Sequence, residues 1–105
     1  CYGALDEMLA AESTLSQNRA DIVCIVTPNH LHVPIAEAAL KTGFHVACDK
    51  PLGTNLEECL GLEQTLKAAP GLKFLLTHNY TGYPMVKQAK KLVNEGAIGS
   101  VRKVQ

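Results

Sequence analysis

Three short apolar runs divide the chain and predict three strands. The first, over residues 21–26, is continuously apolar after its opening aspartate and is rich in β-branched side chains. A continuous run, unlike an alternating one, is typical of a strand that is covered on both faces of a parallel sheet. Residues 44–48 and 73–77 form two further runs of this kind. We therefore expect three parallel strands with both faces buried.

Helical patterns precede, separate and follow these runs. A short amphipathic helix is expected over residues 4–11, and the helix after the first strand is expected to stop at Gly43, a residue suited to a left-handed C-terminal cap. A third helix is predicted over residues 55–69, with Thr54 and Glu57 forming a capping box at its start. Its expected buried residues are Leu56, Cys59, Leu60, Leu62 and Leu66.

The C-terminal part of the chain repeats the pattern once more. Residues 84–95 predict a helix that opens with a proline and ends at a glycine, and residues 101–105 alternate like the first piece of a further strand. The order β-α-β-α-β-α with short connections indicates an α/β protein with right-handed crossovers. We expect part of a doubly wound parallel sheet with helices over its faces, ending where a second domain starts.

Polar residues follow each predicted strand, at residues 27–32, 49–52 and 78–83. Ligands of open parallel sheets bind beyond the carboxyl ends of the strands. Lys50 has the clearest chemical potential, because partial burial between a strand end and Pro51 would let it exchange a proton near neutrality. The alternative for Lys50 is a surface side chain paired with Asp49.

The overall charge argues against several classes of partner. Ten basic residues balance ten acidic ones among 105, so neither nucleic acid nor an anionic membrane surface is an expected partner. No apolar run is long enough to span a membrane, and the first residues do not resemble a signal peptide.

Cysteine and histidine usage gives no metal or nucleophile site. Cys24 and Cys48 lie in strand-like runs, where we expect buried, inert thiols and hence a cytoplasmic protein. His30 and His32 are two residues apart with no third ligand nearby, so we expect no metal site. A doubly wound hydrolase is also disfavoured, because no Gly-x-Ser-x-Gly elbow occurs.

Several motifs in one order resemble the Gfo/Idh/MocA family of oxidoreductases. Residues 20–32 carry an apolar strand, a Thr-Pro-Asn turn and, three residues after the asparagine, His32. An Ala-Leu-rich helix and a strand closing with Asp-Lys-Pro at 49–51 follow, where the family's pattern has Glu-Lys-Pro. Asn79 and the Gly-Ala-Ile-Gly turn at 96–99 also match.

This resemblance implies a site for NAD or NADP and a hydride transfer to or from a sugar, polyol or related hydroxyl substrate. Lys50 would be the catalytic residue, moving the hydroxyl proton or polarising the carbonyl while the cofactor carries the hydride. The implied cofactor-binding residues are Thr27, Pro28, Asn29, His32, Asp49, Lys50, Pro51 and Asn79. Thr27 to Asn29 would border the ribose and diphosphate, with His32 steadying their loop.

The chain departs from the family's pattern in three places. Asp49 replaces a glutamate and has a shorter reach, and Thr81 stands where many members carry an arginine. No Gly-x-Gly-x-x-Gly occurs, so the sequence does not distinguish NAD from NADP. We expect residues 1–97 to form a partial dinucleotide-binding Rossmann domain without its glycine-rich first half, and residues 98–105 to open a substrate and oligomerisation domain.

The leading hypothesis is therefore a fragment of an NAD(P)-dependent dehydrogenase that acts on a small molecule and assembles as a homo-oligomer. The alternative is a non-catalytic binding or interaction module built from a degenerate half of a Rossmann domain. The 105-residue chain by itself is expected to be inactive in either case.

Overall fold

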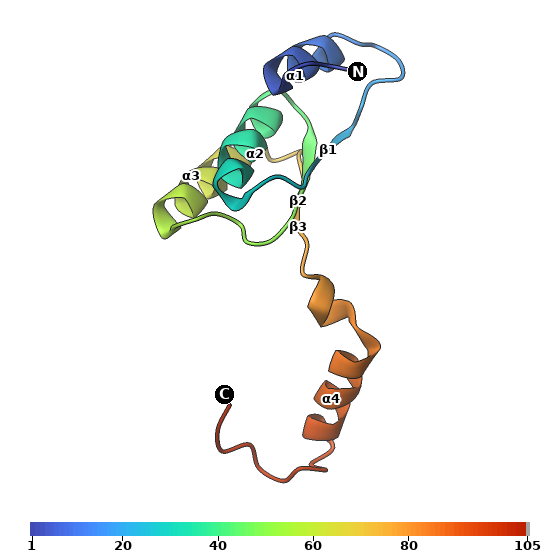
Figure 1. Cartoon of the computed structure of the whole chain (residues 1–105), viewed down its shortest axis with the longest axis vertical. Helices are drawn as coiled ribbons and strands as arrows, with labels where there is room; N and C mark the ends of the chain where they lie inside the picture. Colours follow the sequence, from blue (N-terminus) through green and yellow to red (C-terminus); the bar gives the residue numbers. More distant parts are fainter. Residues whose placement is uncertain (105) are drawn as a thin grey trace.

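The computed structural model describes residues 1–104 and has an α/β body followed by an extended C-terminal arm (Figure 1). In chain order the elements are α1 (Leu5–Ser13), β1 (Ile22–Ile25), the 3-10 helix η1 (Asn29–Leu31), α2 (His32–Lys41), β2 (His45–Cys48), α3 (Leu56–Lys67), β3 (Phe74–Leu76), the 3-10 helix η2 (Asn79–Gly82) and α4 (Pro84–Asn94). The expected alternation of strands and helices is confirmed over residues 4–95.

The strands form a parallel three-stranded sheet in the order β1-β2-β3. Ile22 lies opposite His45 at one end of the β1–β2 pair, and Ile25 lies opposite Cys48 at the other. Cys48 in turn lies opposite Leu76 of β3. Because both pairs are parallel, the carboxyl ends of all three strands lie at one edge of the sheet.

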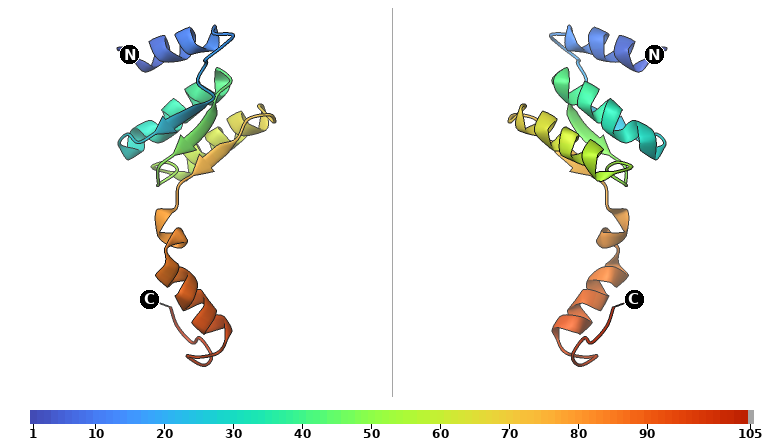
Figure 2. Two further views of the ribbon diagram at one scale, coloured as in Figure 1. Left: turned by 90° about the vertical axis from the view of Figure 1, so that its right-hand side faces the viewer. Right: turned by 90° about the vertical axis from the view of Figure 1, so that its left-hand side faces the viewer.

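Only one face of this sheet is covered within the described residues. The pattern along β1 alternates, with Val23 and Ile25 buried and Ile22 and Cys24 exposed. Helices α2 and α3 lie on the face to which the buried side chains point, as the two views of Figure 2 show. The expectation that both faces would be covered is therefore wrong for this chain, and so is the expectation that the Cys24 thiol is buried.

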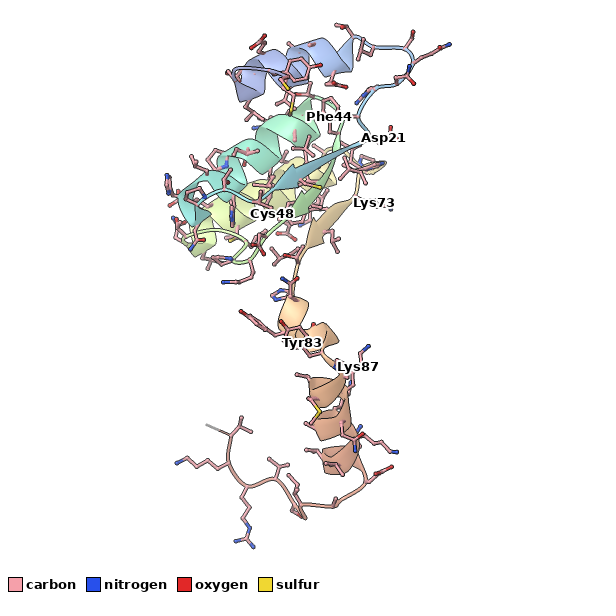
Figure 3. All side chains as sticks on the ribbon, turned by 45° about the vertical axis from the view of Figure 1, so that its right-hand side comes forward. Asp21, Phe44, Cys48, Lys73, Tyr83 and Lys87 are labelled. Carbon is pink, nitrogen blue, oxygen red and sulfur yellow. The ribbon has the colours of Figure 1, made fainter. Side chains whose placement is uncertain are left out.

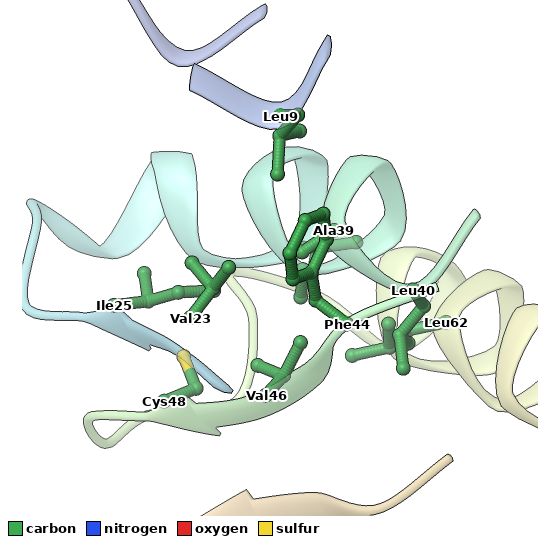
Figure 4. Close-up of a cluster of buried hydrophobic side chains, with 11 residues drawn as sticks. Leu9, Val23, Ile25, Ala39, Leu40, Phe44, Val46, Cys48 and Leu62 are labelled. Carbon is green, nitrogen blue, oxygen red and sulfur yellow. The ribbon is translucent and has the colours of Figure 1, made fainter. Parts of the chain in front are cut away.

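The covered face holds a single apolar core (Figure 4). Strands β1 and β2 contribute one set of alternate side chains, and α2 contributes alanines that are fully buried, which lets the helix lie close to the sheet. Phe44, 1 % exposed, sits between α1 and this layer. The core residues are Leu9, Val23, Ile25, Val33, Ala36, Ala39, Leu40, Phe44, Val46, Cys48 and Leu62.

The turn before β2 is held by glycine and an arginine. Gly43 has a φ of +91°, as expected for a left-handed cap after α2. Arg19, from the loop before β1, donates from Nη2 to the Gly43 carbonyl at 2.7 Å and lies 4.4 Å from the centre of the Phe44 ring. The polar loop is thus fastened to the core by a hydrogen bond and a cation–π contact.

Helix α3 begins one residue later than its capping box predicts. Asn55, not Thr54, is the N-cap, and its side chain accepts from the Glu58 amide at 3.0 Å. The Glu58 carboxylate accepts from the amide and hydroxyl of Thr54 in return. Of the five residues expected to be buried on α3, only Leu62 is; Leu56 and Leu60 are exposed, and Cys59 and Leu66 are half-buried.

The arm after β3 leaves the body of the molecule. Every residue of α4 is exposed, and Figure 3 shows the arm around Tyr83 and Lys87 projecting away from the sheet. The radius of gyration is 18.4 Å and the longest extent 58 Å, whereas a compact chain of this length would have a radius of about 13 Å. The strand expected at 101–105 is absent over residues 101–104, and Gln105 lies outside the described residues.

The difference between a buried and an exposed leucine gives a direct test of this core. Leu40→Ala should lower the free energy of unfolding by about 2–5 kcal/mol, since Leu40 is 2 % exposed and its loss leaves a cavity. Leu60→Ala, at a helical position that is 50 % exposed, should cost less than about 1 kcal/mol. Urea unfolding of both variants measures the difference. Equal losses would contradict the core described here.

Candidate functional site

The strand ends are joined by backbone hydrogen bonds one residue beyond the sheet. The Asp49 amide donates to the Ile25 carbonyl at 2.9 Å, and the Thr77 amide donates to the Cys48 carbonyl at 2.9 Å. These bonds continue the parallel ladders and fix the segments that follow. The three polar junctions predicted from the sequence therefore begin side by side at one edge.

The His32 ring contacts the backbone of two of these junctions, the loop after β1 and the loop after β2. Its side chain is 1 % exposed at the first residue of α2. Nδ1 lies 2.6 Å from the Pro51 carbonyl oxygen, and Nε2 lies 2.9 Å from the Thr27 carbonyl oxygen. The ring thus holds the loop after β1 and the loop after β2 at a fixed separation. From the sequence, His32 was expected to steady only the loop after β1. Its contact with the Pro51 carbonyl also holds the loop after β2.

Asp49 is held by its neighbours rather than by a lysine. Its Oδ1 accepts from the Thr77 hydroxyl at 2.8 Å and from the Lys50 amide at 2.9 Å. These two hydrogen bonds, the Thr77 one above all, lower the pKa of the Asp49 carboxyl below its ordinary value. Asp49 is consequently an anion at neutral pH, and its carboxylate is anchored to Thr77, the residue directly after β3.

Lys50 is exposed rather than partly buried, and its ammonium group forms no ion pair with Asp49 in the described structure. The expected partial burial of Lys50 is therefore wrong, whereas the alternative is right about its surface position and wrong about the pairing with Asp49. The burial that would favour proton exchange is absent here, and so is the surface pairing with Asp49. The Lys50 side chain is free to contact a ligand at the edge of the sheet.

A shallow cavity of about 270 Å³ lies on the uncovered face at this edge. Asp49 and Asn79 line it together with Thr77, which joins β3 to the site. Its remaining lining residues are Cys24, Ile25, Val26 and Ala47. The structure therefore brings two of the predicted cofactor residues into one cavity, and the open face of the sheet forms its floor.

The turn after β1 supplies a second group of predicted residues. Pro28 and Asn29 are exposed next to the start of η1, and Pro51 is exposed in the loop after β2. Thr27 is half-buried, and its hydroxyl oxygen is buried without a hydrogen-bond partner in the described structure. It lines a different cavity of about 400 Å³, toward α1. Thr27 thus lies just beyond the carboxyl end of β1, as Asp49 lies just beyond that of β2, but the two residues line different cavities.

Two residues of this architecture were not singled out from the sequence. Thr77 is the last residue of the third predicted run and directly follows β3, and its position beside Asp49 follows once the strands are known to be in register. His45, at the start of β2, accepts at Nδ1 from the Lys73 amide at 3.0 Å. It fastens β3 to β2 at the edge of the sheet opposite the site.

Two negative findings concern the residues that the structure describes. Residues 1–104 contain no cluster of three or more potential metal ligands, and His30 is exposed while His32 faces carbonyl oxygens. Across the same part of the chain, each helix is too short or too polar to cross a membrane.

The geometry suits a ligand with hydroxyl groups and polar ring edges. An anchored carboxylate at Asp49 can accept from hydroxyls, the Asn29 and Asn79 amides can donate and accept, and the exposed Lys50 ammonium can donate. Such groups above an apolar floor are typical of small-molecule sites, which combine apolar walls with a few polar side chains.

Comparison with known proteins agrees with this geometry. Residues 2–75 match the model of an oxidoreductase family with an NAD-binding Rossmann fold, named GFO_IDH_MocA. The match includes α1, which lies outside the motifs recognised in the sequence. Levoglucosan dehydrogenase of Pseudarthrobacter phenanthrenivorans is 41% identical over 80 residues, covering 76% of this chain and 20% of that protein. The 2,7-anhydro-N-acetylneuraminate hydratase of Escherichia coli is 33% identical over 94 residues, covering 90% and 25%.

Solved structures show the same fold. An inositol dehydrogenase homologue from Azotobacter vinelandii, complexed with NADH and myo-inositol, superposes with a TM-score of 0.84 at 31% identity, covering 97% of this chain and 26% of that one. An oxidoreductase from Sinorhizobium meliloti gives 0.79 at 46% identity, covering 96% and 28%. The chain thus spans about a quarter of the length of these relatives, and it belongs to the Gfo/Idh/MocA family of oxidoreductases with an NAD-binding Rossmann fold.

Proposed function

We propose that this chain is part of the nicotinamide-binding domain of an oxidoreductase that transfers a hydride between NAD or NADP and a sugar, polyol or related hydroxyl substrate. The observation that carries the proposal is the joint position of Asp49, Lys50 and Asn79 at one edge of a sheet whose family binds NAD. The coverage of about a quarter of each relative supports the view that further segments complete the enzyme.

The residues of this edge divide into two groups. The family resemblance implies that Thr27, Pro28 and Asn29, in the turn between β1 and α2, border the ribose and diphosphate of the cofactor. It also implies that Asp49 and Asn79, which line the cavity on the open face, approach the nicotinamide end. Pro51 shapes the second loop, and its carbonyl is held by His32. The orphaned Thr27 hydroxyl is a polar atom that a ligand could satisfy.

Lys50 would be the catalytic residue. A bound nicotinamide ring supplies the hydride acceptor or donor for such a reaction. Lys50 would hold or move the proton of the substrate hydroxyl, or polarise the corresponding carbonyl through its ammonium group. Because Lys50 is exposed in this structure, bound cofactor and substrate would have to cover its ammonium group.

The activities of similar proteins support a polyhydroxylated substrate. One relative is a levoglucosan dehydrogenase, and solved neighbours are an inositol dehydrogenase homologue with myo-inositol and a scyllo-inositol dehydrogenase with scyllo-inositol. Another relative is named a hydratase, so the net reaction differs among proteins of similar sequence. Both solved complexes contain NAD(H), and we favour it as the first cofactor to test.

A second candidate function is that of an interaction module acting through the open side of the sheet. The observation that favours it is the exposed apolar surface there: Ile22 is 55 % exposed, Leu75 61 % and Val26 82 %. Contiguous apolar surface of this kind marks interaction sites. A homo-oligomer is the form of this interaction that we propose.

In the complete enzyme, Lys50→Ala should lower turnover by about 10²–10⁴-fold and should weaken cofactor binding far less, since the main loss is acid-base assistance. Lys50→Arg should also fail, because guanidinium keeps the charge but does not release its proton. Lys73→Ala, at the opposite edge of the sheet, is the matched control and should keep turnover. Steady-state kinetics decide, and turnover near the parent value for Lys50→Ala would contradict the assignment.

The 105-residue chain by itself should bind NAD weakly, with a dissociation constant of about 1 mM or above, because few contacts offset the cost of immobilising the cofactor. Amide NMR shifts during titration should change at Asn29, Lys50 and Asn79. Asn29→Ala should reduce the response, whereas Asn94→Ala, on α4, should not. Shift changes confined to α4, or micromolar binding, would refute this picture.

Self-association of the chain should depend on the open face. Leu75→Lys should shift the population toward monomer, because it places a charge on that face. Leu60→Lys makes the same chemical change at a 50 % exposed position on α3 and should have a much smaller effect. Sedimentation velocity over a range of concentrations measures both. A monodisperse monomer for the unaltered chain would remove the interaction module from consideration.

A further inference from the structure

The Asp49 carboxylate and the Thr77 hydroxyl form a pair at the cavity on the open face of the sheet. Thr77 Oγ1 donates to Asp49 Oδ1 at 2.8 Å, and both residues line the cavity. The main chain of each residue is fixed by the parallel ladders: the Asp49 amide donates to the Ile25 carbonyl, and the Thr77 amide donates to the Cys48 carbonyl. The pair is therefore held from two strands.

Both groups that donate to this carboxylate reach the same oxygen. Oδ1 accepts from the Thr77 hydroxyl and from the Lys50 amide, and no group within residues 1–104 donates to Oδ2. An ionised carboxyl has only acceptor oxygens, so the lone pairs of Oδ2 are available to a ligand. The pKa of Asp49 is lowered chiefly by the Thr77 hydrogen bond, which keeps the carboxyl in this acceptor form at neutral pH.

Thr77 offers a second acceptor beside the first. A threonine hydroxyl has one proton and two lone pairs, and here the proton is donated to Asp49 Oδ1. Toward any further group, Thr77 Oγ1 can therefore only accept. Oγ1 is hydrogen-bonded to Oδ1, and Oδ2 shares its carbon with Oδ1, so the two available acceptors are neighbours. A ligand that satisfies both must present two adjacent donors.

The rest of the cavity favours hydroxyl groups over anionic ones. No lysine, arginine or histidine of the described chain is among its lining residues. A phosphate or carboxylate placed there would meet the Asp49 anion without a lining cation to offset the repulsion. Ile25, Val26 and Ala47 give the cavity an apolar floor, on which the carbon face of a ring can rest. Two hydroxyls on adjacent ring carbons match these features.

We propose that Asp49 and Thr77 form an acceptor pair for a vicinal diol of the ligand, with Thr77 also the positioning residue that leaves Asp49 Oδ2 free. This inference deepens the proposed function and rests on it for the source of the diol. That function supplies two sources, the ribose of the cofactor and the polyol substrate. Both present the same chemistry, two neighbouring hydroxyl donors on a ring.

Amide NMR titrations of the unaltered 105-residue chain test the pair with small probes. Nicotinamide riboside carries the ribose diol, myo-inositol carries ring diols, and nicotinamide carries neither. We expect the Asp49, Thr77 and Asn79 signals to shift with a diol probe and not with nicotinamide at the same concentration. A response to the riboside alone assigns the diol to the cofactor, and a response to myo-inositol alone assigns it to the substrate. An equal response to nicotinamide, or none to either diol, would overturn the proposal.

Threonine variants test the contribution of the hydroxyl. Thr77→Val keeps the branched shape and the backbone hydrogen bond to Cys48, and should weaken diol binding about 3–10-fold, the size expected for a lost hydrogen bond. Thr77→Ser keeps the hydroxyl and should bind nearly as the parent does. Thr81→Val is the matched control, because its hydroxyl donates to the His78 carbonyl and not to Asp49. Parent-level diol binding by Thr77→Val would contradict the assignment.

The carboxyl of Asp49 gives a readout that needs no ligand. Carboxyl ¹³C NMR over a range of pH should show that Thr77→Val raises the Asp49 pKa, because the hydrogen bond that favours the anion is lost. Thr77→Ser should restore the low pKa, and Thr81→Val should leave it unchanged. An Asp49 pKa that does not rise in Thr77→Val would show that Thr77 does not position this carboxylate.

A further variant covers the case in which Thr77→Val does not fold. Asp49→Asn replaces one acceptor oxygen by an N–H₂ donor and should abolish the response to the diol probes. A parent-level response in Asp49→Asn would overturn the acceptor pair by itself.

Failure of this inference and failure of the proposed function give different results. If the Asn29 and Lys50 signals respond to NAD while the diol response does not depend on Thr77, the function stands and the acceptor pair is removed. If myo-inositol binding depends on Thr77 but the complete enzyme transfers no hydride, the pair stands and the function is removed.

Discussion

The packing of α2 against the β1–β2 pair is the contact on which the rest of the molecule depends. Ala36 and Ala39 are fully buried at this contact, and their small side chains allow the helix to lie directly on Val46 and its neighbours. The crossover that this packing imposes makes β1 and β2 parallel. Parallel strands put both following loops at one edge, and α2 begins at that edge with His32 beneath them.

Some of the polar groups at this edge hold one another before any ligand is present. Thr77 holds the Asp49 carboxylate, and His32 holds the carbonyls of Thr27 and Pro51. These contacts fix the loop backbones, while the side chains of Asn29 and Lys50 remain exposed. Such an arrangement separates positioning groups from groups free to bind, which reduces the entropy that a ligand must offset on binding.

Helices cover one face of the sheet, and the other face is open within the described residues. Apolar side chains of β1 and β3 face solvent on the open side, and α4 stands away from the body with all its residues exposed. Relatives of this chain are about four times its length. The open face and the cavity that holds Asp49 and Asn79 are thus uncovered within the described residues.

The sequence by itself determined the elements and their order, because these depend on local rules: apolar runs give strands, Gly43 ends α2, and Pro84 opens α4. It also placed Asn29, Asp49 and Asn79 at strand ends, because a parallel sheet puts all its carboxyl ends together. The exposure of Cys24 and Val26 was not predictable in this way, since a continuous apolar run is compatible with one covered face as well as with two.

Contacts between distant residues were decided only by the tertiary structure. The Thr77–Asp49 and His32–Pro51 bonds span 28 and 19 residues, and the shift of the N-cap from Thr54 to Asn55 depends on how the chain enters α3. The exposure of Lys50 depends on which segments pack over it. The physical reason is that local propensity sets where an element begins and ends, whereas burial and hydrogen-bond partners depend on strand register and on the surfaces that come together.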